Sequence, residues 1–140
     1  MTLTMQTARK RLALLWFGGA GVCFIVLLLI SFFSRTANLT DLWDWFLPAT
    51  VPNLSLILGV LVYTHRQQIL PEMHVDVFLF RLAFGLSLLY LLLLLLPLLS
   101  FPLTGKTLPE LLDISRLWLA AVQGLATGVM GAFFVRQDEK

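Results

Sequence analysis

The sequence predicts an all-α integral membrane protein, a bundle of four transmembrane helices with both termini in the cytoplasm. Composition is the first reason: 59% of the 140 residues are apolar and only 13% are charged, whereas soluble domains are about 25% charged. Patterning is the second, since the apolar residues fall into four long runs that no charged residue interrupts. Because about 20 apolar helical residues cross a 30 Å hydrocarbon core, each run is long enough to span a bilayer.

Lipid offers no hydrogen-bond partner to backbone amides, so each run should be helical. The runs are too long for barrel strands and lack an alternating pattern. We expect the spans at about residues 12–33, 48–64, 78–99 and 115–135. The connecting segments are too short to bury a core of their own, so residues 1–140 should form a single membrane domain.

The first span follows the basic sequence Arg9-Lys10-Arg11. It is longer than the apolar region of a secretory signal and has no small-residue cleavage site, which favours a retained anchor. The only cysteine, Cys23, lies in this span. A single cysteine excludes an intramolecular disulfide, and its apolar setting favours a packing role.

The second span is the weakest, because Pro48 and Pro52 interrupt it. Residues 39–47 predict a separate short helix in the membrane interface, with Trp43 and Trp45 at headgroup level. The crossing helix would then begin near Pro52, since proline is tolerated in a first turn.

The third span has twelve leucines between Leu82 and Leu99, enough to insert unaided, and Pro71-Glu72 indicates the start of its helix. Before the fourth span, residues 107–110 (Thr-Leu-Pro-Glu) form a capping box. The fourth helix should therefore begin well before the membrane and extend for about 28 residues, or roughly 42 Å. Asp113 and Arg116 are spaced to pair on its first turns.

The distribution of lysine and arginine between the two sides of the membrane predicts the orientation of the chain. With four crossings, seven basic residues lie on the side of the termini and three on the other side, which makes the terminal side cytoplasmic. The net charge of +2 mainly reflects this asymmetry, so the basic pI does not indicate nucleic-acid binding. A cell membrane, specifically a bacterial inner membrane, is the expected location.

Small residues recur every four positions in the fourth span, at Ala120, Gly124, Gly128 and Ala132. Such a strip, with its GxxxG core, lets two helix backbones approach closely in lipid. Packing inside one bundle is the favoured interpretation, with the Gly18–Gly21 patch as the natural partner. Self-association between chains is the alternative.

Among the polar side chains within the spans, three could meet at similar depth: Asn53, Gln123 and Thr127. We expect a structural hydrogen bond between Gln123 and Asn53. The functional alternative is that these residues line a polar pathway.

Arg81 is flanked by apolar residues, and Glu72, His74 and Asp76 lie just before it. Ionisable groups at a membrane are often functional, so these residues are a candidate site at the cytoplasmic rim. The simpler interpretation is that Arg81 snorkels or pairs with Asp76 or Glu72. His65 and His74 lack the spacing of metal ligands, so we predict neither a metal nor a cofactor.

The spans contain no histidine or aspartate, so the residues required by intramembrane proteases are absent. We therefore expect a non-catalytic protein: an oligomeric pore or membrane-perturbing component, or the membrane subunit of a larger complex. Its expected partners are the lipid bilayer and either further copies of itself or a membrane-complex protein. The alternative is a small transporter or membrane enzyme that uses the rim site.

Overall fold

A computed structural model of the chain describes residues 4–34, 39–66 and 76–135. They form four helices: α1 (Met5–Phe33), α2 (Leu39–Arg66), α3 (Val77–Ser100) and α4 (Leu108–Val135). All four are long and apolar enough to cross a membrane. The predicted all-α fold with four candidate membrane spans is thus confirmed.

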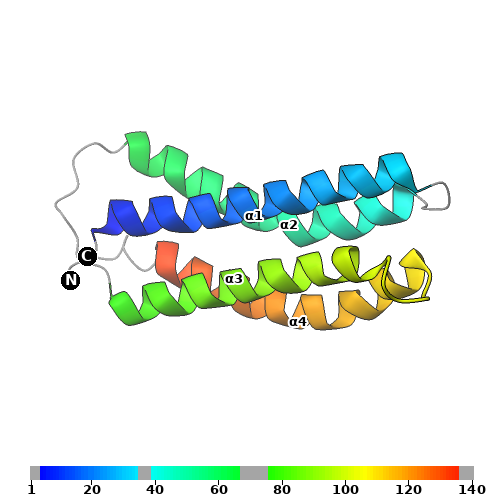
Figure 1. Ribbon diagram of the computed structural model, residues 1–140. Coiled ribbons are helices and arrows are strands. Elements are labelled where there is room, and N and C mark those ends of the chain that lie inside the picture. The colour runs from blue at the N-terminus through cyan, green and yellow to red at the C-terminus, as the bar shows by residue number, and fades with distance from the viewer. Residues whose placement is uncertain (1–3, 35–38, 67–75, 136–140) are drawn as a thin grey trace.

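The helices are arranged as two antiparallel hairpins, α1–α2 and α3–α4, that lie one on the other (Figure 1). Helix α1 packs against α2 and α3, and helix α4 packs against the same two helices. Helices α1 and α4 therefore occupy diagonal corners of the bundle. The beginning of α1 and the end of α4 lie at the same end of the molecule.

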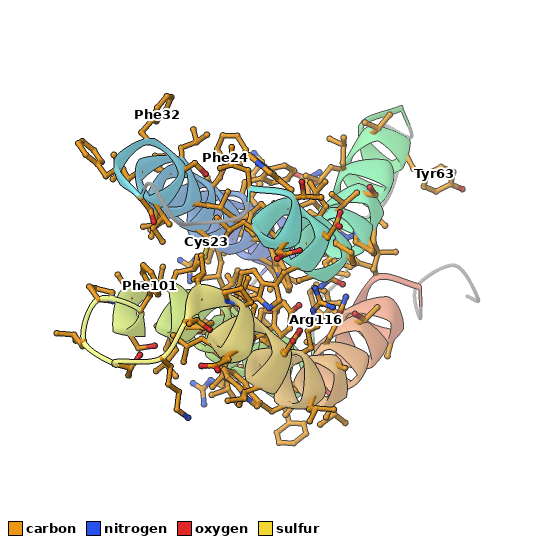
Figure 2. All side chains as sticks on the ribbon, turned by 90° about the vertical axis from the view of Figure 1, so that its right-hand side faces the viewer. Cys23, Phe24, Phe32, Tyr63, Phe101 and Arg116 are labelled. Atoms are coloured by element: carbon orange, nitrogen blue, oxygen red, sulfur yellow. The ribbon has the colours of Figure 1, made fainter. Side chains whose placement is uncertain are left out.

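Helix α2 is continuous from Leu39 to Arg66 and contains both Pro48 and Pro52. The separate interfacial helix predicted for residues 39–47 is therefore not seen, and this segment forms the first turns of α2 instead. Trp45 is buried rather than lying at the surface of the molecule. The opposite end of α2, at Tyr63, lies apart from the other three helices in both views of the bundle (Figures 1 and 2).

Side-chain caps fix the first turns of α3 and α4. The Asp76 carboxylate accepts a hydrogen bond from the Phe78 backbone N–H at 3.0 Å and caps α3. The structure describes α3 from Val77, and the predicted start at Pro71-Glu72 lies outside the described residues. The Glu110 carboxylate accepts from the Thr107 N–H at 3.2 Å, as the capping box predicts. Helix α4 has the predicted length of 28 residues.

The core consists of leucine and aromatic side chains from all four helices. The Trp16 and Tyr90 rings lie 5.6 Å apart between α1 and α3. Near the end of the bundle where α1 begins, the Arg9 guanidinium lies 5.9 Å from the centre of the Phe134 ring of α4. Cys23 is buried among the helices (Figure 2), which agrees with a packing role.

Candidate functional site: an exposed strip and a polar seam

The small residues of α4 face away from the bundle. Ala120, Gly124, Gly128 and Ala132, here called the α4 strip, are all exposed. A Cβ atom added to Gly124 or Gly128 would meet no atom within 4 Å. The expectation that this strip packs inside one bundle is wrong, because the inner face of α4 carries large side chains instead: Leu119, Met130, Phe133 and Phe134.

The expected partner of the strip, the Gly18–Gly21 patch on α1, also lies elsewhere. Helix α1 is diagonal to α4, and Gly19 faces α3. A Cβ atom on Gly19 would lie 2.6 Å from the Leu91 Cδ1 atom. The glycine at position 19 therefore permits close packing between α1 and α3, whereas Gly18 and Gly21 have open space beside them.

Polar side chains of α4 meet α2 in a line next to the strip. The Thr127 hydroxyl donates to the Asn53 side-chain oxygen at 2.8 Å, and the Gln123 amide donates to the Pro48 carbonyl at 3.2 Å. The bond predicted between Gln123 and Asn53 is replaced by these two contacts. We call Asn53, Gln123 and Thr127 the polar seam; Asn53 is buried, and the other two are partly exposed.

The contact made by Gln123 explains how α2 tolerates a proline in the membrane. Pro52 has no N–H, so the carbonyl four residues earlier, at Pro48, loses its helical donor. Gln123 supplies a donor to that carbonyl. The adjacent Ala49 carbonyl accepts a hydrogen bond from the Tyr90 hydroxyl at 2.8 Å. Side chains of α3 and α4 thus satisfy α2 backbone groups, as the lipid interior requires.

Sequence reasoning missed Tyr90 and its neighbour Ser87, both of which are fully buried. A signal was present, because they are the only hydroxyl side chains between Leu82 and Leu99. They are three residues apart and so lie on one face of the helix. That pattern predicts an inward face for α3, which the structure shows.

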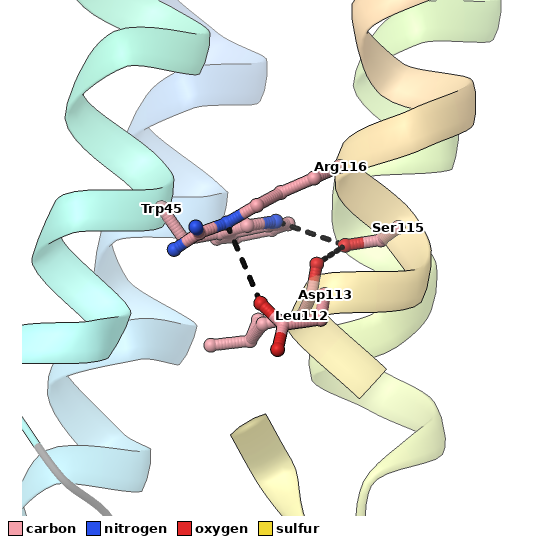
Figure 3. Close-up of polar contacts among 5 residues, drawn as sticks. All are labelled: Trp45, Leu112, Asp113, Ser115 and Arg116. Carbon is pink, nitrogen blue, oxygen red and sulfur yellow. Dashed lines mark hydrogen bonds and ion pairs between the residues drawn. The ribbon is translucent and has the colours of Figure 1, made fainter. Parts of the chain in front are cut away.

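A second set of polar contacts lies near the other end of α4 (Figure 3). The Trp45 indole N–H donates to the Ser115 hydroxyl at 2.9 Å, and that hydroxyl donates to the Leu112 carbonyl at 2.7 Å. Arg116 Nε lies 3.9 Å from Asp113 Oδ1, so the predicted ion pair is confirmed. Its two side chains are largely exposed, which limits its contribution to stability.

The candidate rim site is only partly within the described residues. Glu72 and His74 lie outside them. Asp76 is occupied as the cap of α3, and Arg81 lies exposed in the second turn of that helix. Within residues 4–34, 39–66 and 76–135, no group of three histidine, cysteine or acidic side chains is placed to bind a metal ion.

Comparison with known proteins gives no relative. No protein family, curated protein or solved structure matches this chain. The α4 strip and the polar seam are therefore the features of the molecule that bear on its function.

Proposed function

We propose that this chain is a non-catalytic membrane protein that assembles with further copies of itself through the α4 strip. The observation that carries the proposal is the open space beside Gly124 and Gly128 on an exposed helix face. Each glycine costs a helix about 1 kcal/mol relative to alanine. In lipid, that cost is offset where a second backbone packs closely against the small residues. The described part of one chain places no such backbone beside Gly124 or Gly128.

The position of the polar seam supports a pore-type or membrane-perturbing assembly. Gln123 and Thr127 lie on α4 beside the strip and are partly exposed. Association through the strip would bring the seams of neighbouring chains close to the interface. Polar groups inside a membrane protein commonly line ion pathways, so seams that meet at an interface between chains could line one.

The proposed location is the inner membrane, with both termini in the cytoplasm. The seven-to-three distribution of basic residues supports this orientation. The common position of the beginning of α1 and the end of α4 agrees with it. Reporter fusions at residues 70 and 106 should find the first cytoplasmic and the second external.

The test of assembly is the double substitution Gly124→Leu with Gly128→Leu. Two leucines would fill the surface where a second backbone must approach, so we expect the dissociation constant of the oligomer to rise by more than about tenfold, or about 1.4 kcal/mol. The measurements are the oligomer distribution of the purified protein in bilayers, by single-molecule photobleaching, and ion leakage from the same vesicles.

The matched control is Gly18→Leu with Gly85→Leu. These glycines lie exposed on α1 and α3, with no atom within 4 Å of an added Cβ. The control should leave the oligomer and the leakage unchanged. An unchanged oligomer in the α4 variant would refute the proposal. An oligomer without leakage would refute the pore function and favour the membrane subunit of a larger complex.

A further inference from the structure

Buried polar side chains gather at one level of the bundle interior. Trp16 of α1, Asn53 of α2, and Ser87 and Tyr90 of α3 are all 0% exposed. They come from three helices, and the Thr127 hydroxyl of α4 joins them through Asn53. Such a cluster is unusual in a membrane bundle, because polar side chains are costly to bury in its interior.

The contacts place these groups at similar heights along the bundle axis. The Trp16 ring lies against the Tyr90 ring, and the Tyr90 hydroxyl bonds to α2 at the Ala49 carbonyl. Ser87 precedes Tyr90 by three residues, and Asn53 follows Ala49 by four, which corresponds to about 4.5 and 6 Å along the helices. Because α2 and α3 run in opposite directions, both displacements point toward the same end of the bundle.

Three of these side chains have a polar atom that no described residue satisfies: the Trp16 indole nitrogen, the Asn53 amide nitrogen and the Ser87 hydroxyl. By contrast, the buried indole of Trp45 has a protein acceptor, the Ser115 hydroxyl. Indole and amide N–H groups can only donate. Each of these two N–H donors therefore needs an acceptor that no described residue provides.

We propose that this level of the bundle is a binding site for internal water, which accepts hydrogen bonds from Trp16 and Asn53 and shares one with Ser87. A water molecule has two acceptor lone pairs and makes two to four bonds in protein interiors. Among the described residues, the buried polar side chains are all neutral: Thr50, Asn53, Ser87 and Ser115. With no buried charge to balance an ion, the donors suit a neutral acceptor.

The site belongs to a single chain and does not depend on assembly through the α4 strip. Its donors point into the interior, whereas the strip lies on the outer face of α4. The Gly124→Leu and Gly128→Leu variant should therefore retain the water. The site and the proposed oligomer can fail separately.

One test uses Ser87→Ala, measured as the midpoint of unfolding in a detergent titration. Removing a satisfied buried hydroxyl destabilises a protein, whereas removing an unsatisfied one stabilises it. We expect the Ser87→Ala midpoint to fall, as it should in the control Ser115→Ala, whose hydroxyl is bonded on both sides. An unchanged or higher midpoint for Ser87→Ala would overturn the proposal.

The second test measures the unsubstituted chain and uses a variant of the site only to assign a signal. Solid-state NMR of the chain in bilayers with ¹⁵N-labelled tryptophan should show magnetisation transfer from water to the Trp16 indole N–H, with its signal assigned by Trp16→Phe. Trp45 serves as the buried indole with a protein partner, and its transfer should be weaker by several-fold. Equal, negligible transfer to both indoles shows a dry interior and refutes the water site.

Discussion

Helices α3 and α4 share the most extensive contact in the bundle, yet their outer faces carry side chains of very different size. The inner face of each helix is mainly large, with two small residues: Ala83 and Ser87 on α3, and Ser115 and Ala126 on α4. The outer face of α3 is lined by exposed leucines. Helix α4 carries Leu119, Met130 and Phe133 inward and the α4 strip outward. Two neighbouring helices thus present very different surfaces to the surroundings of the bundle.

The difference between the two outer faces distinguishes a surface suited to lipid from a surface suited to protein. Leucine side chains are stabilised when they face hydrocarbon, so the exposed face of α3 needs no protein partner in lipid. Alanine and glycine gain little there and form a shallow surface that a backbone can approach. The comparison supports the proposal that protein covers the outer face of α4, whereas the outer face of α3 suits lipid.

The largest effect is expected on the inner face of α4, with Phe133→Ala. Phe133 is 2% exposed and contacts the rings of Phe80 and Phe134, so truncation should cost about 3 kcal/mol of unfolding free energy. The matched control is Leu125→Ala on the outer face, where the side chain is 61% exposed and little should change. Unfolding in a detergent titration measures both. Equal losses would show that the outer face of α4 is packed as tightly as the inner one.

An intermediate effect is expected for Tyr90→Phe on the inner face of α3. The substitution keeps the ring beside Trp16 but removes the hydroxyl bond to the Ala49 carbonyl. Hydrogen bonds between membrane helices contribute about 0.6–2 kcal/mol, and the unfolding midpoint should fall accordingly. A midpoint equal to that of the unmodified chain would mean that this bond does not support α2.

The smallest effect is expected for Asp113→Asn on the exposed first turns of α4. Its carboxylate lies 3.9 Å from Arg116 Nε, and both side chains are more than half exposed. Pairs of this kind contribute about 0.2–1 kcal/mol and are screened by salt. The loss of stability should be near the lower limit and should vanish in high salt. A larger, salt-independent loss would indicate that Asp113 has another role.

Most of the architecture could be predicted from the sequence because it follows from local properties. Span length alone indicates four helices, and the Thr107–Glu110 capping box indicates where α4 begins. The continuity of α2 could not be predicted in this way. Whether a helix continues through Pro52 depends on donors such as Gln123 and Tyr90, which are distant in the sequence and close only after folding.

The direction of the α4 strip could not be predicted either. A row of small residues favours close packing against any helix, whether it belongs to the same chain or to another. The opposite row, which includes Leu119 and Met130, is large and apolar and would suit lipid equally well. Only the positions of α1 and α2 in space show which row faces inward.

The dependence of α2 on donors from α3 and α4 has a consequence for biosynthesis. Residues of α2 leave the ribosome before Tyr90 and Gln123 have been made, so the nascent helix reaches the bilayer with the Pro48 carbonyl still lacking its donor. Its span is also less apolar than that of α1 or α3. Stable insertion of α2 must therefore wait for the second hairpin, and a chain truncated after residue 66 should leave this segment at the membrane surface or in the insertion machinery.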